Sequence, residues 1–305
     1  MPAAERIVEI SEAITHLSTR HEQLVVKRDS EAEISVPLNE LATLILSGKR
    51  STISQPLLSG IMRHGGSVVV CDNAYQPIGL MLPLNVHTLQ TERIRAQCRS
   101  SLPRCKRLWQ QIVKLKVLAQ AGVLHRSTGN DAGLKHLATK VLSGDRTNIE
   151  GHAAQRYWPR VFSDPNFRRR REGGGANRLL NYGYAVLRAA VGRAICATGL
   201  HPSIGLHHRH RNNPWCLADD LMEPYRTVVD EAVVQWVENR GHDCPMNGET
   251  KTVLVSALTQ RVQSGGETRT LFAWIERTAS TLAQAYLEET DRIFYPEGLF
   301  SGHKK

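Results

Sequence analysis

The clearest helical pattern in this chain is residues 177–202, NRLLNYGYAVLRAAVGRAICATGLHP. Its apolar residues recur at the three- and four-residue spacing of one helix face: Leu179, Leu180, Val186, Leu187, Val191 and Ile195. Gly199 suits the left-handed residue that ends many helices, and Pro202 cannot continue one. The pattern therefore predicts a long helix that ends near Gly199.

The same period extends over most of the chain from about residue 86 onward. Three further apolar stripes have helical spacing, at residues 108–118, at 228–237 before Gly241, and at 270–287. These stripes, together with residues 177–202, predict a mainly helical domain.

Residues 1–83 have a different pattern. Short segments rich in Val, Ile and Leu alternate with polar turn residues, which is typical of strands. The predicted strands are residues 6–11, 14–18, 23–28, 34–37, 41–46, 67–71 and 77–82, with one helix at 54–64 that Gly65-Gly66 ends. The sequence therefore predicts an α+β multidomain fold. A small β-rich domain, residues 1–84, is followed by a larger mainly α-helical domain, residues 85–305.

Charge is unevenly distributed along the 305 residues, whose formal net charge is +10. Residues 93–226 carry 24 basic and 8 acidic side chains, a net charge of +16, whereas the segments on either side each have a net charge of −3. A solvated helix surface accounts for scattered Lys and Arg in many proteins. Concentration of the charge in one segment favours a phosphate-binding face, and hence nucleic acid as partner.

The sequence gives no indication of a membrane or secreted protein. The most apolar stretch, residues 184–200, is interrupted by Arg188 and Arg193, and acidic residues lie where a secretory signal needs apolar ones. Six cysteines form neither a CxxC pair nor a dense framework. We expect no membrane span, reduced thiols and a cytoplasmic location.

The densest group of chemically active side chains lies at residues 204–226, IGLHHRHRNNPWCLADDLMEPYR. Three histidines, His207, His208 and His210, precede a turn and a predicted helix. On that helix Asp220 and Glu223 would be three residues apart, so that their carboxylates share one face and could approach a common ion. A divalent metal would offset their repulsion and would also use an upstream imidazole.

Simpler interpretations exist for the same residues. Asp219-Asp220 would complement the dipole at a helix start, and Arg226 would form a salt bridge with Asp220 or Glu223. The three histidines would also suit an unrelated zinc hydrolase, but no Cys pair or His-x3-His spacing supports a closed zinc shell. A second acidic candidate, Glu150, follows a predicted helix cap at Asn148, where a ligand role and a dipole role are about equally favoured.

Three segments resemble a known family: EGHAAQRYW at residues 150–158, NRLLNYGYAVLRAAV at 177–191 and GLHHRHRNNPWCLADDLMEPYR at 205–226. Together they are similar to the CRISPR-associated endonuclease and integrase that captures new spacers. The resemblance covers nearly the whole chain and implies a β domain joined to a larger helical domain. NPWCLADDLMEPYR looks most like the variants of type II systems.

The resemblance also implies functional residues. Glu150, His208 and Glu223 match the positions that bind one divalent ion, and Asp220 matches a further acidic position that would support or replace a ligand. Two carboxylates and one imidazole suit Mg²⁺ or Mn²⁺, with the nitrogen favouring Mn²⁺ somewhat. His207 and His210 match no family role.

Other side chains are candidates for contact with DNA. Arg168, Arg169, Arg170 and Arg171 form a basic segment before three glycines, which we expect to be a mobile loop along the DNA backbone. Arg226 is a candidate for neutralising phosphate. Asn181 and Tyr184 belong to the LNYGY segment, and we expect Tyr184 to be a core ring whose hydroxyl points toward the site.

By resemblance, the reaction would be attack of a DNA 3′-hydroxyl on a phosphodiester, which inserts captured fragments into the CRISPR array. The implied partners are double-stranded DNA, a second copy of the chain in a homodimer, a small ferredoxin-like companion protein and the type II effector nuclease. An inactive DNA-binding homologue is the alternative from another functional class.

Overall fold

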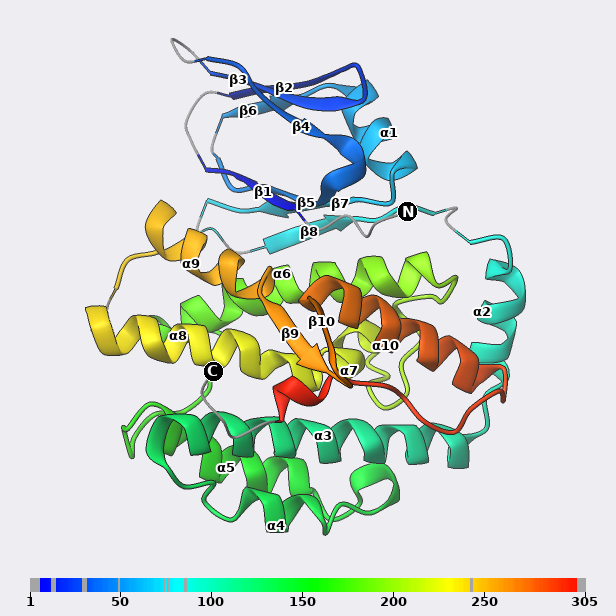
Figure 1. Ribbon diagram of the computed structural model, residues 1–305, viewed down its shortest axis with the longest axis vertical. Helices are drawn as coiled ribbons and strands as arrows, with labels where there is room; N and C mark the ends of the chain where they lie inside the picture. The colour runs from blue at the N-terminus through cyan, green and yellow to red at the C-terminus, as the bar shows by residue number, and fades with distance from the viewer. Residues whose placement is uncertain are drawn as a thin grey trace.

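The computed structural model of the protein describes residues 6–11, 15–28, 32–48, 50–73, 75, 77–84, 87–241 and 244–300. A small β-rich part lies at one end of a larger helical part (Figure 1). The chain passes from one to the other between β8 (Pro77–Met81) and α2 (Gln90–Arg99), and the predicted boundary after residue 84 falls in this connection. The expected α+β architecture is confirmed.

Two four-stranded sheets form the N-terminal part. One has the strand order β4-β3-β2-β6, and the other has the order β1-β5-β7-β8, in which β8 alone runs antiparallel to its neighbour. Their bounds are β1 (Arg6–Ile10), β2 (Thr15–Arg20), β3 (Gln23–Arg28), β4 (Ile34–Pro37), β5 (Leu41–Leu46), β6 (Ser51–Ile53) and β7 (Ser67–Cys71). A short turn, η1 (Leu38–Glu40), leads into β5, and α1 (Gln55–Arg63) is capped by Ser54, whose Oγ accepts a bond from the Leu57 N–H.

The sheet that contains β5 is covered on both faces. Leu41 and Leu44 belong to a small core shared with α1 and the other sheet, whereas Ala42 and Ile45 belong to the large core of the helical part. Strands buried on both faces have continuous apolar sequences instead of alternating ones. This burial explains the run LATLIL at residues 41–46.

The helical part is built around α6 (Ala176–Ala197), the helix predicted from residues 177–202. Buried residues occur all around α6, which packs against α8, α10 and the sheet (Figure 1). Gly183 permits the close contact with α8, because a Cβ there would lie 2.4 Å from Cγ1 of Val229. The remaining helices are α3 (Leu102–Thr128), α4 (Leu134–Ala138), α5 (Ile149–Val161), α7 (Cys216–Leu221), α8 (Arg226–Arg240), α9 (Gly248–Leu258) and α10 (Leu271–Tyr286), with short turns η2 (Ser143–Asp145), η3 (Glu223–Tyr225) and η4 (Glu297–Leu299).

A few elements differ from the sequence-based expectation. A hairpin of β9 (Arg261–Ser264) and β10 (Glu267–Thr270) lies inside the helical part, and its two-residue loop uses Gly265 and Gly266 with φ of 56° and 80°. Glycine accepts these positive angles without strain, so the Gly-Gly pair was the available signal. The predicted strand start at Ile14 and helical onset near Val86 lie outside the described residues.

A buried ion pair joins the two parts. Lys251 on α9 is 1% exposed, and its Nζ lies 3.1 Å from Glu9 Oε1 on β1. Lys251 also donates a 3.0 Å hydrogen bond to Ser47 Oγ, and Ser47 donates a 2.6 Å bond to Glu9. This polar contact therefore fixes the sheet against α9.

No disulfide joins the six cysteines, which all lie within the described ranges. Across the part of the chain that the structure describes, no helix has both the length and the apolar character needed to cross a membrane.

Candidate functional site

Glu150 lies in the first turn of α5, and two side chains fix that turn. The Asn148 Oδ1 accepts a 3.2 Å bond from the Gly151 N–H, which confirms the predicted cap. The Asp145 carboxylate accepts bonds of 2.9 Å and 3.0 Å from the N–H groups of Ile149 and Glu150. These contacts satisfy backbone donors that a helix start leaves unpaired, and they hold Glu150 in place.

Asp220 contacts the histidine loop, which is the supporting one of the two roles that the resemblance implied. Its carboxylate is completely buried and accepts backbone bonds of 2.7 Å from Leu206, 3.0 Å from His207 and 3.2 Å from His208. Gly205 packs against this carboxylate, since a Cβ there would lie 2.9 Å from Asp220 Oδ2. Asp220 therefore shapes the histidine loop. A single helix would have let Asp220 and Glu223 contact one cation together. In the described structure the two carboxylates have different partners.

The helix that was expected to align Asp220 with Glu223 is interrupted. α7 ends at Leu221, and Glu223 begins the tighter turn η3, whose second residue is Pro224. Proline has no N–H for a helical bond, which accounts for the change of geometry. As a result the two carboxylates contact different partners.

His208 is oriented by Asp220. Its Nδ1 lies 2.6 Å from Asp220 Oδ1, and this hydrogen bond is the main reason why the pKa of His208 is raised. A histidine that donates one ring N–H to a carboxylate presents its other nitrogen, Nε2, to a ligand. Asp220 therefore orients His208, the predicted imidazole ligand.

Glu223 is 5% exposed and has two cationic neighbours. Its Oε1 lies 3.0 Å from Arg226 Nε, and its Oε2 lies 2.6 Å from Lys116 Nζ. Burial opposes ionisation of Glu223, but the charges of Arg226 and Lys116 prevail and lower its pKa. The salt-bridge interpretation of Arg226 is thus confirmed.

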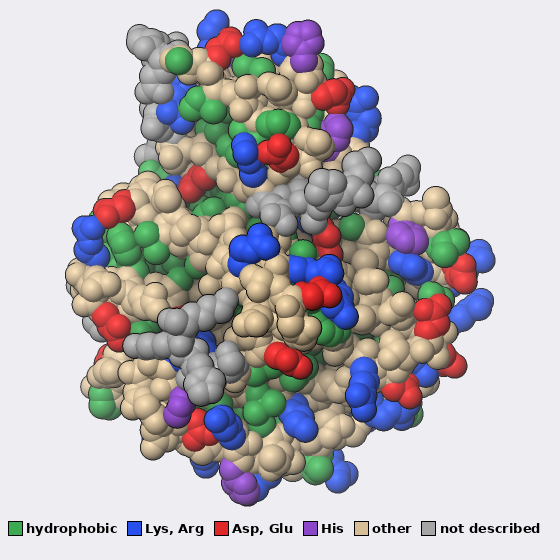
Figure 2. All heavy atoms as spheres, viewed as in Figure 1, with side chains coloured by type: hydrophobic (Ala, Val, Ile, Leu, Met, Phe, Trp, Pro, Cys, Tyr) green, Lys and Arg blue, Asp and Glu red, His purple; other side chains and the backbone are tan. Residues whose placement is uncertain are grey.

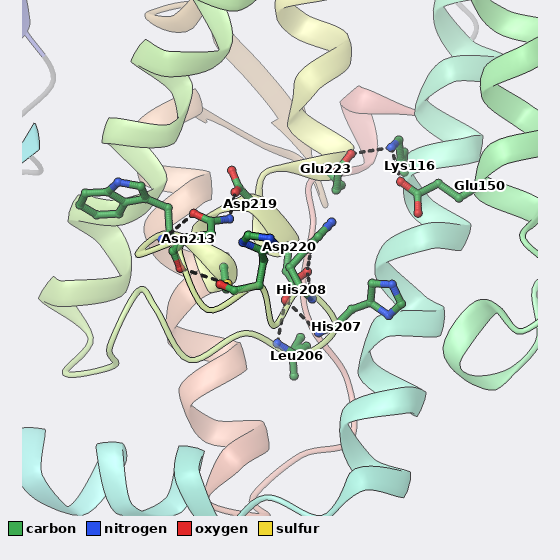
Figure 3. Close-up of polar contacts among 12 residues, drawn as sticks. Lys116, Glu150, Leu206, His207, His208, Asn213, Asp219, Asp220 and Glu223 are labelled. Atoms are coloured by element: carbon green, nitrogen blue, oxygen red, sulfur yellow. Dashed lines mark hydrogen bonds and ion pairs between the residues drawn. The ribbon is translucent and has the colours of Figure 1, made fainter. Parts of the chain in front are cut away.

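Lys116 on α3 also contacts Glu150. Its Nζ lies 2.6 Å from Glu150 Oε1, so one ammonium bridges the two predicted metal-binding carboxylates (Figure 3). The sequence analysis missed this residue. A signal was available, because Lys116 is four residues after Ile112 and three after Val113, both completely buried, and so occupies an apolar face of the helix.

The histidines do not gather around one point. His207 stacks on Trp109 of α3, with ring centroids 4.4 Å apart, whereas His208 contacts Asp220. His210 accepts a 3.4 Å bond from the Asn212 N–H. Among the residues in the described ranges, no group of three His, Cys, Asp or Glu side chains is placed to hold a metal ion. In this arrangement, Glu150 and Glu223 surround Lys116.

The basic segment before α6 is anchored to that helix and does not fit the expected mobile loop. Arg169 donates bonds of 3.2 Å and 2.6 Å to the side-chain oxygens of Asn177 and Asn181. Asn181 in turn donates a 2.5 Å bond to the Arg171 carbonyl. Arg168, Arg170 and Arg171 have exposed side chains, so they can meet a ligand while Arg169 holds the segment.

Tyr184 is a core ring, as expected, but its hydroxyl does not point toward the predicted ligands. It donates a short hydrogen bond to Asp230 on α8, which also accepts a 3.0 Å bond from Tyr157. The guanidinium groups of Arg226 and Arg169 lie 4.6 Å and 5.2 Å from the Tyr184 ring centroid. Tyr184 therefore links the basic segment to Arg226, the partner of Glu223.

A cavity of about 760 Å³ lies beside His208, between α2, the start of α3 and residues 203–214. Arg209 and Arg211 contribute positive charge to its lining. Gln97 of α2 fixes one wall, since it donates bonds of 2.9 Å and 2.8 Å to the carbonyls of His201 and Ile204. The sequence analysis did not identify Gln97, because its partners are far along the chain.

Charge is mixed over the face shown in Figure 2. Lys and Arg side chains are interspersed with Asp and Glu there, and no single basic patch covers that face. The excess positive charge of residues 93–226 includes two local groups of arginines, one in the anchored basic segment and one in the wall of the cavity.

Comparisons with known proteins agree with this architecture. A CRISPR-associated endonuclease Cas1 of Neisseria meningitidis is 35% identical over 268 residues, which cover 87% of each chain. Among solved structures, a casposase bound to an integration product has a TM-score of 0.77 at 19% identity, covering 94% of this chain and 92% of the other. A Cas6-RT-Cas1–Cas2 complex has a TM-score of 0.74 at 20% identity, covering all of this chain and 37% of that one. These two likenesses show the fold.

The family described as CRISPR associated protein Cas1 matches residues 8–251, which include both sheets, Glu150, the histidine loop and Glu223. The N-terminal β-rich part, the helical part around α6 and the motif residues therefore have one common explanation. This chain belongs to the Cas1 family of CRISPR-associated proteins.

Proposed function

We propose that this protein is a metal-dependent DNA integrase and endonuclease of CRISPR adaptation, which joins captured DNA fragments to the CRISPR array. One observation carries the proposal. Glu150 and Glu223, from distant parts of the chain, each place a carboxylate oxygen 2.6 Å from the same ammonium nitrogen. The fold has thus built a position for positive charge between two carboxylates, beside a histidine loop.

The donor types of Glu150, Glu223 and His208 suit Mg²⁺ or Mn²⁺, although no three described side chains form a ligand group as they are placed. Carboxylate oxygens suit both ions, and the imidazole of His208 would add a nitrogen that suits Mn²⁺. The Lys116 ammonium already lies between Glu150 and Glu223, which supports the proposal that this pair receives a cation. A divalent ion held by these three side chains would polarise a phosphodiester and stabilise the negative charge of an in-line transition state.

The protein's own residues would prepare the reaction. Asp220 holds His208 in one orientation, and Arg226 compensates the charge of Glu223 at the edge of the site. Attack by water would cleave the DNA, whereas attack by a 3′-hydroxyl forms a new phosphodiester and releases the 3′ oxygen of the old one. The family membership and the type II-like motif at residues 213–226 favour strand transfer during spacer acquisition.

The proposed partners follow from charge and family. Double-stranded DNA suits the net charge of +16 on residues 93–226. A Cas2-like companion is supported by the fold shared with a chain of a Cas1–Cas2 complex. We also propose a homodimer, formed in a prokaryotic cytoplasm, and cooperation with a type II effector nuclease. The exposed edge strand β4, with Ile34 47% exposed, is suited to pairing.

The test is strand transfer of a labelled duplex into a supercoiled plasmid that carries a CRISPR repeat, with Mn²⁺ and the companion protein. Wild type is compared with His208→Ala and Glu223→Ala, with EDTA and His207→Ala as controls. His207 is a matched control, because it neighbours His208 but stacks on Trp109.

We expect joining by wild type and His207→Ala, and none by the two ligand variants or with EDTA. If every form binds DNA alike and none joins or cuts it, the protein is a DNA-holding homologue and the proposal is wrong. Activity that resists EDTA and depends on tightly bound zinc would indicate the zinc hydrolase instead.

A further inference from the structure

Lys116 is the one group that contacts both predicted metal-binding carboxylates among the described residues. Its side chain is 14% exposed, and it extends from an apolar face of α3. Its ammonium lies against one oxygen of each carboxylate, and so places a cationic group between them.

A divalent cation and this ammonium need the same oxygens. Lys116 Nζ lies 2.6 Å from Glu150 Oε1 and 2.6 Å from Glu223 Oε2. Mg²⁺ contacts its oxygen ligands at about 2.0–2.1 Å, so an ion shared by these two atoms would overlap the ammonium. The two cations exclude each other from the space between the carboxylates.

The local charge leads to the same conclusion. Two carboxylates in a half-buried site repel each other strongly unless a cation lies between them. Arg226 contacts the far oxygen of Glu223 and does not contact Glu150 in the described structure. Lys116 is therefore the group that holds the pair together when no ion is present.

Lysine is suited to a reversible contact of this kind. Its ammonium is a compact charge at the end of a flexible stem, whereas an arginine forms a more rigid planar contact. Part of the side chain reaches solvent, so a change of rotamer along its flexible stem is the proposed way for the ammonium to leave the carboxylates.

We infer that Lys116 is an internal cation that competes with the divalent ion for Glu150 and Glu223. In the metal-free protein it holds the two carboxylates close together, and metal binding requires its displacement. The inference rests on the proposed function, since it assumes that these carboxylates receive an ion.

The experiment measures Mn²⁺ binding to the full chain by titration calorimetry and by electron paramagnetic resonance, without DNA. Lys116→Met keeps most of the side-chain length but removes the charge. Lys114→Met removes the same charge from an exposed position of the same helix and serves as the matched control. Glu223→Gln identifies the signal that belongs to this site.

Removal of an internal competitor raises the apparent affinity by the inverse of the fraction of molecules in which the site is open. We expect Lys116→Met to bind Mn²⁺ about tenfold more tightly than wild type or Lys114→Met. Binding of Mn²⁺ at this site should be lost in Lys116→Met/Glu223→Gln. In EDTA, Lys116→Met should have a lower Tm than wild type, and Mn²⁺ should raise that Tm by more than it raises the wild-type value.

Two further outcomes separate the inference from the proposed function. If wild type and Lys116→Met bind Mn²⁺ at this site with equal affinity, or the variant binds more weakly, Lys116 is not a competitor, although the metal site stands. If neither protein binds Mn²⁺ in a way that Glu223→Gln abolishes, the proposed metal-dependent function fails and this inference with it.

Discussion

Asp220 Oδ1 lies 2.6 Å from His208 Nδ1, and the same carboxylate accepts the backbone N–H groups of residues 206, 207 and 208. One buried side chain thereby fixes both the path of the loop and the orientation of the ring. A carboxylate can serve all these donors because it has two oxygens and no N–H or O–H of its own when ionised. Asp220 is a positioning residue for His208.

We therefore expect Asp220→Asn to weaken Mn²⁺ binding by about 10- to 100-fold, as loss of a partner behind a metal-binding histidine commonly does. The amide offers one acceptor oxygen, and its NH₂ would face backbone donors. Asp219→Asn is the control, because Asp219 contacts Arg188 and Asn213, whereas Asp220 holds residues 206–208. Titration calorimetry on both variants checks this, and equal affinities in the two would contradict it.

The contact between the two parts of the molecule leads to a second prediction. Lys251→Met would remove one member of this largely enclosed ion pair, in which the side chains of Lys251 and Glu9 are 2% and 13% exposed, and such a loss typically costs about 3–5 kcal/mol of unfolding free energy. Glu9→Met/Lys251→Met should recover most of that loss, since apolar side chains can replace a buried pair. Urea unfolding measures both, with Arg240→Met at an exposed pair as the control. A single variant as stable as wild type would show that the pair does not hold the sheet on α9.

Much of the fold could be predicted because its signals are local. The apolar period of α6 and the glycine at its end depend only on residues within the helix, and the strand pattern before residue 83 is similarly local. The β9–β10 hairpin was missed because its strands are only four residues each and lie between helices. Such short segments carry little periodicity.

The site was predicted less completely, for a physical reason. The resemblance supplied Glu150, His208 and Glu223, but contacts made across the fold decide what surrounds them. Lys116 and Gln97 act on partners distant in the chain, and their own neighbours in sequence do not indicate this. Asp220 was expected to support or to replace a metal ligand, and only its contact across the fold with His208 distinguishes these two roles.

Asp230 makes stability depend on pH. Burial raises its pKa from 3.8 to about 6, although hydrogen bonds from Tyr184 and Tyr157 and the charge of Arg226 act in the other direction. The folded protein thus binds the Asp230 proton more tightly than the unfolded chain. The stabilisation that this proton provides is fully present below about pH 4. It decreases as the pH rises through 6 and is absent at higher pH.

Asp230→Asn cannot titrate, so other groups cancel when it is compared with wild type. We expect the unfolding free energy of wild type minus that of the variant to fall by about 2 kcal/mol between pH 4 and pH 7. Urea unfolding at several pH values measures this difference. A difference that is constant or rises with pH would show that the carboxyl is not protonated preferentially in the folded state.

The anchored basic segment separates two kinds of arginine. Arg170 and Arg171 have exposed side chains, whereas Arg169 hydrogen-bonds Asn177 and Asn181 within the protein. If the exposed pair contacts DNA phosphates, each arginine releases about one counterion on binding. Arg170→Gln/Arg171→Gln should therefore weaken binding of any duplex sequence. The negative slope of log affinity against log salt should become shallower by about 2.

Fluorescence anisotropy of a labelled duplex over a series of KCl concentrations measures that slope. Arg261→Gln/Arg292→Gln removes the same charge from exposed positions of the acidic C-terminal segment and should leave the slope unchanged. Arg169→Gln should instead lower the Tm, because it removes the bonds that fix the segment to α6. An unchanged slope in the Arg170 and Arg171 variant would place the DNA backbone elsewhere on the protein.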